Sequence, residues 1–538
     1  MSKIKITFQP SGKSVLIPKG ISIKDAAKIV DIIIDSPCGG IGKCGKCKVK
    51  VIKGTTKPSS FEKKCISNKD IKNGIRLACQ TKVSEEMIVT IPDKLDVDLK
   101  KMLLSEVKSV KSQKYSDKFG VAIDIGTTTI VGILVDLTTN DTISVAAKDN
   151  PQYEHGADVI SRINYSINNQ NGTKKLQNYI VTAINSIIKR FVKNTGIHSG
   201  QIRKMTIAGN TTMQHLFMGI NPEKLAIAPY KPTVKGLYDS VNSFEIGIDI
   251  DKNAEIYIIP NISGWIGGDT LSMIFALGFD KSDKIKLAID IGTNGEIVLG
   301  SKERILVTST AAGPCFEGVN ISCGMRASKG AIESVYFTDE GVYCNVIGNV
   351  TAKGLCGSGM IDAMAELLKY KIIDDTGRFR NYKELKKELS PVLLDSVIED
   401  NKRIKFLVYK NSAHNIFITQ QDIREFQLAK AAICAGIKLL VNELGITVED
   451  IDEVLLAGTF GNYIDKSNAQ KVGLIPSVSL EKVKYVGNAA CDGARLALVS
   501  QKVRNEMEEN IKTIEHINLI SQKDFQKTFV GAIYFPNK

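Results

Sequence analysis

An identical internal repeat restricts the fold more than any other feature of this sequence. The string AIDIGT occupies residues 122–127 and occurs again at residues 288–293, 166 positions later. In both copies an apolar run ends near an aspartate, and a glycine turn with polar neighbours leads into a second apolar run. Each copy therefore predicts a strand, a tight turn and another strand, and their separation is that of a subdomain. We expect a duplicated α/β fold with one such hairpin in each lobe.

The turn residues of both copies suit phosphate binding. Gly126 and Gly292 lack a side chain, so that backbone N–H groups can approach phosphate oxygens closely. Polar side chains that can donate to the same oxygens follow each glycine: Thr127, Thr128, Thr293 and Asn294. Asp124 and Asp290 can hold Mg²⁺ through its water molecules, because this ion retains several of them. Two such hairpins facing each other predict an ATP and Mg²⁺ site with these aspartates as its catalytic residues.

A third glycine-rich element follows the second copy. Residues 455–465, LLAGTFGNYID, come after an apolar strand pattern, which is where an adenosine-binding turn belongs in folds with two such phosphate hairpins. The sequence contains no G-x-x-x-x-G-K-[ST] string, which excludes a P-loop, and no G-x-G-x-x-G string where a Rossmann site needs one.

Four of the eleven cysteines have the spacing of an iron–sulfur site. They follow the pattern C-x5-C-x2-C with a distant fourth member: Cys38, Cys44, Cys47 and Cys79. The plant-type 2Fe–2S spacing is C-x4-C-x2-C with a distant fourth ligand, so the first gap here is one residue longer. Four glycines in the string CGGIGKCGKC let the backbone turn around a small inorganic core. These residues predict a 2Fe–2S cluster with cysteine as its metal ligand.

Two alternatives to this assignment remain open. A zinc ribbon usually has two C-x2-C pairs, and the sequence has one. Cys65 is a rival fourth ligand, although Cys79 lies in the string RLACQT, which resembles the fourth-ligand segment of this ferredoxin type. The flanking pattern predicts a β-grasp ferredoxin fold. We expect a hairpin at residues 3–9 and 13–18, a helix at residues 22–30, and strands at residues 47–52 and 87–91.

A chain of 538 residues is too long for one ordinary hydrophobic core. We expect a 2Fe–2S ferredoxin domain at residues 1–92 and a mobile linker at residues 93–118. The first lobe of the ATPase, with the phosphate 1 loop, then spans residues 119–200. The remainder, with the phosphate 2 and adenosine elements, spans residues 201–538.

The net charge of +13 is unevenly distributed. Residues 1–118 contain 25 Lys and Arg against 12 Asp and Glu, whereas the remaining residues contain equal numbers of the two signs. The excess indicates either a solvated lysine-rich surface or a docking face for acidic redox partners. No recognised nucleic-acid motif accompanies the lysines. No apolar run is long enough to span a membrane, and the N-terminus lacks a signal-peptide pattern, so we expect a cytoplasmic protein.

The two phosphate elements and the adenosine element, in this order, resemble the superfamily of acetate and sugar kinases, heat-shock chaperones and actin. With the N-terminal cysteine motif, the whole chain looks like the reductive activators of corrinoid-dependent enzymes. The strings that carry this resemblance include PCGGIGKCGKC, DIGTTT, NPQYEHGADVISRI, AGNTTMQHL, AIDIGTNGEI, LCGSGMID and AGTFGNYID. Such activators restore the inactive Co(II) state of a methyltransferase corrinoid protein to Co(I), with consumption of ATP.

The resemblance implies further partners and leaves one other function open. It implies that Gly458 and Thr459 lie near the adenosine of ATP. It also implies a low-potential electron donor such as a ferredoxin or flavodoxin, anaerobic conditions and a homodimer formed through the large domain. Activators of methylamine methyltransferases carry extra 4Fe–4S motifs near the C-terminus, and the last cysteines here, Cys434 and Cys491, form no such motif. The alternative function is that of a redox-regulated small-molecule kinase of the sugar-kinase superfamily, which would consume ATP in proportion to an added acceptor.

Overall fold

The computed structural model describes most of the chain, namely residues 3–9, 12–30, 32, 34, 47–54, 57–66, 68–90, 118–156, 158–233, 241–400, 403–410, 415–461 and 463–536. The chain divides into two compact units, and we describe each by itself. The first unit consists of Met1–Asp98, Phe316–Phe426 and Phe535–Lys538, and the second of Leu99–Cys315 and Gln427–Tyr534. Most of the predicted linker lies outside the described residues.

The N-terminal part of the first unit is a five-stranded sheet with the strand order β2-β1-β5-β3-β4. Its strands are β1 (Lys3–Gln9), β2 (Ser14–Pro18), β3 (Lys48–Lys53), β4 (Ile75–Leu77) and β5 (Met87–Thr90). Helices α1 (Ile23–Ile29), α2 (Ser60–Cys65) and α3 (Asn68–Lys72) connect them. Apolar and charged side chains alternate along β1, so that one face of the strand packs in the core and the other faces solvent. Ile6 and Phe8 are buried, whereas Lys3 and Lys5 are exposed. The predicted β-grasp ferredoxin architecture is confirmed.

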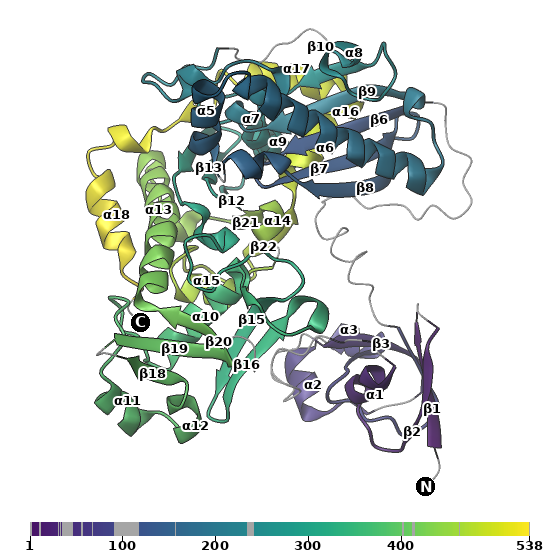
Figure 1. Ribbon diagram of the computed structural model, residues 1–538, viewed down its shortest axis with the longest axis vertical. Helices are drawn as coiled ribbons and strands as arrows, with labels where there is room; N and C mark the ends of the chain where they lie inside the picture. The colour runs from purple at the N-terminus through teal and green to yellow at the C-terminus, as the bar shows by residue number, and fades with distance from the viewer. Residues whose placement is uncertain are drawn as a thin grey trace. The chain divides into compact units, whose positions relative to one another are not determined.

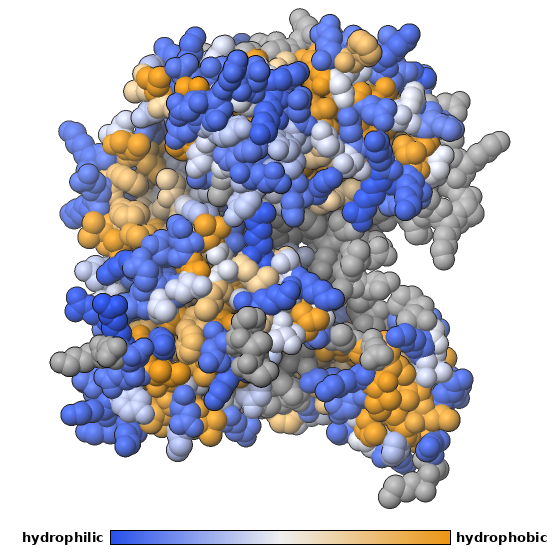
Figure 2. Space-filling view, viewed as in Figure 1, coloured by the Kyte–Doolittle hydropathy of each residue, from blue (hydrophilic) through white to orange (hydrophobic). Residues whose placement is uncertain are grey.

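The surface of this ferredoxin part is partly apolar. Figure 2 shows hydrophobic residues gathered over α1 and the β1–β2 hairpin. Ile29 in α1 and Leu16 in β2 are more than half exposed.

The rest of the first unit contains two three-stranded sheets with the orders β16-β15-β17 and β18-β19-β20. Their neighbouring strands are antiparallel, except that β15 and β17 are parallel. Their strands are β15 (Ala331–Thr338), β16 (Gly341–Val346), β17 (Gly354–Leu355), β18 (Val397–Asp400), β19 (Arg403–Lys410) and β20 (Asn415–Thr419). The helices of this part are α10 (Gly357–Lys369), α11 (Tyr382–Glu388) and α12 (Pro391–Leu394), and α13 (Gln420–Leu444) runs on into the second unit.

The second unit contains two six-stranded sheets that share the order of five strands and differ in the edge on which the sixth strand lies (Figure 1). The first has the order β10-β11-β9-β6-β7-β8 and is built from β6 (Phe119–Ile125), β7 (Thr129–Asp136), β8 (Thr142–Asp149), β9 (Ile202–Gly209), β10 (Val241–Asn242) and β11 (Glu255–Ile258). The second has the order β22-β21-β12-β13-β14-β23 and is built from β12 (Lys286–Ile291), β13 (Gly295–Ser301), β14 (Arg304–Thr310), β21 (Glu453–Ala457), β22 (Val483–Gly487) and β23 (Glu515–His516).

The duplication predicted from the repeat is confirmed by strand pairing. In the first sheet β6 pairs antiparallel with β7 and parallel with β9, and in the second β12 pairs antiparallel with β13 and parallel with β21. The two repeat strings form β6 and β12 together with the turns that follow them. Each sheet therefore presents its glycine turn at the same corner of the same topology.

Helices cover both faces of the two sheets. The helices of the second unit are α5 (Val159–Asn168), α6 (Gly172–Thr195), α7 (Thr211–Met218), α8 (Ser243–Ile246), α9 (Gly268–Ala276), α14 (Gly458–Gly461), α15 (Lys466–Lys471), α16 (Ala489–Val499), α17 (Gln501–Asn510) and α18 (Phe525–Ile533). Short 3-10 helices are η1 (Pro151–His155), η2 (Ser199–Gln201), η3 (Glu223–Leu225), η4 (Phe279–Lys281), η5 (Pro314–Glu317), η6 (Ile347–Asn349), η7 (Val448–Asp450) and η8 (Leu519–Ser521). None of the helices within the described ranges is both long and apolar enough to cross a lipid bilayer.

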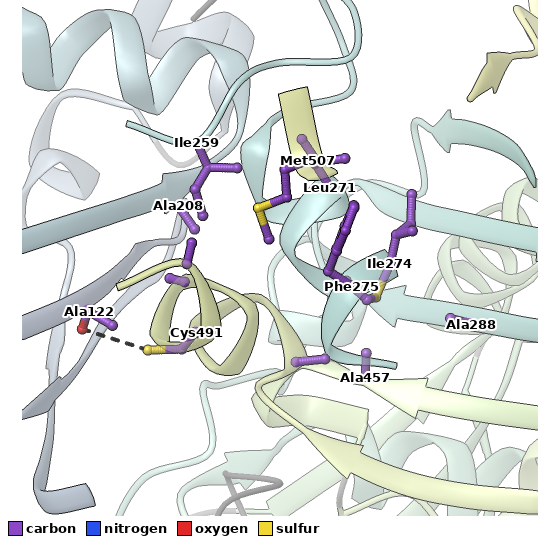
Figure 3. Packing of buried hydrophobic residues seen from close by; sticks show 14 of the residues in the cluster. Ala122, Ala208, Ile259, Leu271, Ile274, Phe275, Ala288, Ala457, Cys491 and Met507 are labelled. Carbon is purple, nitrogen blue, oxygen red and sulfur yellow. Dashed lines mark hydrogen bonds between the residues drawn. The ribbon is translucent and has the colours of Figure 1, made fainter. Parts of the chain in front are cut away.

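A shared core lies where α9 and α16 meet both sheets (Figure 3). Ala122 of β6 and Ala288 of β12 belong to it, together with Phe275 of α9 and Cys491 of α16. The neighbouring residues of β6, Val121 and Ile123, instead pack against the opposite helix, α6. Because strand side chains alternate, Asp124 and Asp290 fall on the same sheet faces as Ala122 and Ala288, toward α9 and α16.

Candidate nucleotide and iron–sulfur sites

The two predicted aspartates occupy equivalent positions in the two sheets. Asp124 is the last residue but one of β6, and Asp290 is the last but one of β12. Asn488, the N-cap residue of α16, donates a hydrogen bond from Nδ2 to Oδ2 of Asp124 over 2.8 Å, and its own Oδ1 accepts from the backbone N–H of Cys491 over 2.8 Å. Helix α16 is thereby tied to the first phosphate hairpin at its N-terminal end.

Two further carboxyl groups lie within electrostatic reach of the aspartates. Asp269 is in the first turn of α9, and Glu296 is the residue of β13 that pairs with Asp290. Burial raises the pKa of Asp124 to about 6, against the opposing hydrogen bond from Asn488. Burial, followed by the charge of Asp124, raises the pKa of Asp290 to about 7.

The same two causes act on the other pair. Burial and then the charge of Asp124 raise the pKa of Asp269 to about 7, with a smaller contribution from Asp290. Burial and the charges of Asp269 and Asp290 raise the pKa of Glu296 well above its usual value. Burial and mutual repulsion thus disfavour the ionised form of all four carboxyl groups. A bound cation would reduce this repulsion and favour their ionisation.

This set fits Mg²⁺ held through water better than a directly ligated ion. Among the residues that the structure describes, no three His, Cys, Asp or Glu side chains are close enough to bind one metal ion directly. Mg²⁺ keeps several of its waters and accepts only one or two protein carboxylates beside phosphate oxygens. The predicted roles of Asp124 and Asp290 are compatible with this arrangement.

Two asparagine side chains brace the first glycine turn. The N–H of Gly126 donates to the carbonyl of Thr129 over 3.1 Å, and a Cβ at Gly126 would lie 2.6 Å from that oxygen. Asn150 donates from Nδ2 to the Gly126 carbonyl over 3.0 Å. Asn210, the N-cap residue of α7, donates from Nδ2 to Oγ1 of Thr127 over 3.1 Å. Hydrogen bonds from Asn150 and Asn210 therefore hold this turn.

A fully buried arginine completes this brace. Arg162 of α5 donates from Nη2 to the Thr127 carbonyl over 2.6 Å, from Nε to the Gly156 carbonyl over 2.9 Å, and from Nη1 to Oε1 of Gln152 over 3.1 Å. Its positive charge lies directly behind the first phosphate turn, where it favours an anion.

Sequence reasoning assigned no role to several of these residues. Asn150, Arg162 and Asn210 belong to the strings NPQYEHGADVISRI and AGNTTMQHL, which carried the resemblance. Asn150 and Asn210 each follow an apolar strand and precede a short helix, which is the usual position of an N-cap. Asn488 has the same position before α16, whereas Asp269 lies within the first turn of α9.

The second phosphate turn meets the third glycine-rich element. The carbonyl of Thr293 accepts a hydrogen bond from the N–H of Gly313 over 3.0 Å. Asp290 pairs with Ala457 across β12 and β21, so Gly458 lies directly beside the aspartate. Gly458 has a φ of +80°, and a Cβ there would lie 2.2 Å from Oδ1 of Asp290. Thr128, Gly292 and Asn294 lie in or beside the turns as predicted, whereas the Thr459 side chain lies outside the described set.

Two of the four predicted cluster ligands lie side by side. Cys47 immediately precedes β3, Cys79 follows β4, and their Sγ atoms are 3.2 Å apart. The N–H of Ala78 donates to the Cys47 carbonyl over 2.8 Å, which fixes the two segments together. Two buried thiols at this separation fit the ligation of one iron atom by a pair of cysteines. Cys38, Cys44 and the side chain of Cys65 lie outside the described residues, so the complete ligand set stays a prediction.

Comparisons with known proteins match all three parts of the chain. The model for a 2Fe–2S iron–sulfur cluster binding domain matches residues 6–84, the RACo middle region matches residues 119–282, and the C-terminal domain of RACo, the ASKHA domain, matches residues 284–538.

Similar proteins cover most of the chain. The corrinoid activation enzyme RamQ of Eubacterium limosum is 35% identical over 428 residues, which are 79% of this chain and 71% of that enzyme. The reductase of the Co(II) methylated amine-specific corrinoid protein of Methanosarcina barkeri is 26% identical over 452 residues, 78% of this chain and 77% of the reductase.

A solved structure extends the similarity to the whole fold. The reductive activator for corrinoid,iron-sulfur protein is 31% identical, with a TM-score of 0.69, and the match covers 99% of this chain and 98% of that one. With its 2Fe–2S domain followed by an actin-like ASKHA domain, this chain belongs to the family of reductive activators of corrinoid proteins.

Proposed function

We propose that this protein is an ATP-dependent reductive activator of a methyltransferase corrinoid protein. One electron passes from a low-potential donor, by way of the 2Fe–2S site, to the Co(II) corrinoid and restores Co(I). The observation that carries the proposal is that this member of the family combines two sites. One is the adjacent pair of thiols of Cys47 and Cys79, and the other is a two-lobed nucleotide site with four mutually repelling carboxyl groups.

The energetics explain why a reductase of this kind needs ATP. Plant-type clusters have reduction potentials of about −400 mV, and Co(I) is a stronger reductant than that. Each 100 mV of uphill transfer costs roughly 2.3 kcal/mol per electron. Nucleotide binding that favours one conformation or one docked complex typically supplies about 1–3 kcal/mol, so binding followed by hydrolysis can drive the transfer.

The residues of the nucleotide site have distinct roles in this proposal. The backbone N–H groups around Gly126 and Gly292 bind phosphate oxygens, and Asp124 and Asp290 orient the water shell of Mg²⁺. MgATP, when bound, supplies the hydrolysis free energy. Asn488 couples the position of the Asp124 carboxylate to α16, because its side chain is hydrogen-bonded both to that carboxylate and to the first turn of the helix. Helices α9 and α16 lie between the lobes, so closure of the lobes around nucleotide is a hinge motion about these helices.

The electron path begins at the ferredoxin part. The cluster, when bound, supplies one-electron transfer at low potential. Cys47 and Cys79 hold one iron, and Cys38 and Cys44 are proposed to hold the other. The donor is a ferredoxin or flavodoxin. We place the protein in the cytoplasm of an anaerobic cell, as a homodimer formed through the large domain.

Anaerobic absorption spectroscopy tests the proposal directly. A purified methyltransferase corrinoid protein in the Co(II) state is mixed with this protein and reduced methyl viologen, with and without MgATP. The Co(I) absorption band should grow only in the presence of MgATP. Normal bleaching of the cluster without any Co(I), for every corrinoid partner supplied, would contradict the proposal and favour the small-molecule kinase.

A further inference from the structure

The lysines around the cluster segment are unusually free of nearby acids in the sequence. Residues 36–61, which include three of the four predicted cluster cysteines, contain six lysines and no aspartate or glutamate. A balanced surface of this length would carry both signs, because interspersed charges favour solubility without creating a strong local field. A stretch of one sign beside an electron-transfer site creates a field that acts on an approaching partner.

Strand β3 places three of these lysines on the solvent side of the sheet. Val49 is buried, whereas Lys48 and Lys50 on either side of it are exposed, as the alternation of a strand requires. Lys53 at the end of the strand pairs with Glu86 over 3.0 Å. Within the described part of the chain, Lys48 and Lys50 have no ion pair. We refer to Lys48 and Lys50 as the β3 lysine pair.

The β3 lysine pair lies at the cluster end of the sheet. Lys48 follows Cys47 directly, and it pairs across the ladder with Leu77, two residues before Cys79. The other exposed lysines of the same face, Lys3 and Lys5 on β1, lie farther away. Lys50 and Gln9 both pair with Thr90 of β5, so Lys50 is level with Gln9, four residues or roughly 13 Å along the strand from Lys5.

We propose that the β3 lysine pair is the docking surface for an acidic electron-carrier protein, which reduces the cluster. The proposal rests on the proposed function, since it names the surface that receives the electron donor. Contact at this end of the sheet brings the carrier next to Cys47 and Cys79, and opposite charge accelerates encounter. The carrier loses one electron and the oxidised cluster gains it, and no bond or proton is exchanged.

The rest of the chain carries no net negative charge to balance this surface. Residues 93–118 contain seven lysines and five acids, so the linker itself is basic. The remaining residues carry equal numbers of positive and negative side chains. The complementary acidic surface is therefore expected on a separate protein.

Stopped-flow reduction of the full-length protein tests the docking surface. The probe is a reduced bacterial 2[4Fe–4S] ferredoxin of strongly negative net charge, and the absorbance of the 2Fe–2S cluster reports its reduction. The double variant Lys48→Glu, Lys50→Glu should lower the second-order rate constant about tenfold or more at low ionic strength. The matched variant Lys3→Glu, Lys5→Glu carries the same charge change on the same face and should change it less than about threefold. Equal losses in both variants, or no loss in the first, would overturn the proposal.

Salt and a small reductant separate docking from other effects. The rate constants of the first variant and the native protein should converge at about 0.5 M salt, because screening removes steering. A difference that persists at high salt would instead indicate a changed cluster potential and would overturn the proposal. Reduced methyl viologen, a small cation, should reduce both proteins at similar rates.

The same materials distinguish the donor from the corrinoid partner. With reduced methyl viologen and MgATP, the variant Lys48→Glu, Lys50→Glu should still form Co(I) at the native rate. Loss of that step with normal ferredoxin kinetics would mean that the lysines dock the corrinoid protein, which contradicts this inference. Absence of Co(I) from the native protein as well would instead contradict the proposed function.

Discussion

At the scale of single residues, the two phosphate hairpins differ in a way that the repeated string conceals. Asp124 pairs with Val131 across its hairpin, whereas Asp290 pairs with Glu296. The first turn is one residue longer, because Ile125 pairs with Ile130 but Ile291 pairs with Gly295. Only the second hairpin therefore sets a second carboxyl opposite its aspartate. The sequence predicted both aspartates, but strand register, which depends on turn length, was needed to place Glu296.

The raised carboxyl pKa values predict how Mg²⁺ and pH act on stability. Asp124, Asp269 and Asp290 have pKa values of about 6 to 7 in the folded protein, above the usual 3.8. The folded state thus binds more protons than the unfolded state between about pH 4 and pH 7, and stability falls as pH rises through this window. We expect Mg²⁺ to raise the melting temperature more at pH 8 than at pH 5.5, as measured by differential scanning fluorimetry.

Asp290→Asn provides the control for this effect. It removes one of the repelling charges, so the metal-free variant should be more stable than the native protein at pH 8, and Mg²⁺ should raise its melting temperature less. An equal effect of Mg²⁺ at both pH values would show that the ion does not act on these carboxyls.

We predict that ATP binding requires glycine at position 458, for two reasons that can be tested separately. Its φ of +80° disfavours any side chain, and a Cβ would lie 2.2 Å from Oδ1 of Asp290. Gly458→Ala should weaken ATP binding about tenfold or more, because Asp290 must move. Gly445→Ala is the matched control, since Gly445 has a φ of +72° and nothing within 4 Å of its Cβ. The control should cost about 1 kcal/mol of stability and leave ATP affinity unchanged in isothermal titration calorimetry.

At the scale of secondary-structure elements, the sequence predicted the strands and hairpins but not the helices that join the two lobes. The alternation in β1 and the apolar runs of β6 and β12 are local patterns, so their strands could be placed without the tertiary structure. Helices α9 and α16 gave no comparable signal of their role. The position of α16 depends on residues far apart in the chain. Asn488 contacts Asp124, and Cys491 contacts Ala122 (Figure 3). The residues that join the two lobes were missed for this reason.

The crossing of α16 and α9 predicts a helix glycine that controls lobe closure. A Cβ at Gly493 of α16 would lie 2.1 Å from the carbonyl oxygen of Ser272 in α9. Gly493→Ala should push the helices apart, lower the melting temperature and slow ATP hydrolysis, although alanine is the better helix former. The control Gly531→Ala lies in α18 with nothing within 4 Å of its Cβ, and it should be neutral or slightly stabilising. Similar melting temperatures for the two variants would show that the crossing tolerates the added methyl group.

At the scale of the whole molecule, the redox site and the nucleotide site belong to separately packed parts of the chain. Cys47 and Cys79 belong to the ferredoxin core with Ile6 and Phe8, whereas Asp124 and Asp290 lie in the second unit. The unequal charge of the sequence already indicated this division, because the excess of lysine ends where the balanced segment begins. The sequence could not show how the two parts communicate, since that depends on contacts made by the assembled protein.

This separation predicts that the two activities can be removed independently. Cys47→Ser should abolish the cluster absorption and Co(I) formation but leave MgATP affinity within about twofold of the native value, because among the described residues none of the nucleotide site packs in the ferredoxin core. Asp290→Ala should abolish ATP hydrolysis but leave the cluster spectrum and its reduction by methyl viologen unchanged. Absorption spectroscopy and calorimetry on both variants measure each property separately. Loss of the cluster in Asp290→Ala, with the protein still folded, would mean that nucleotide binding and cluster assembly are coupled through the fold, and the two sites would then have to be treated as one.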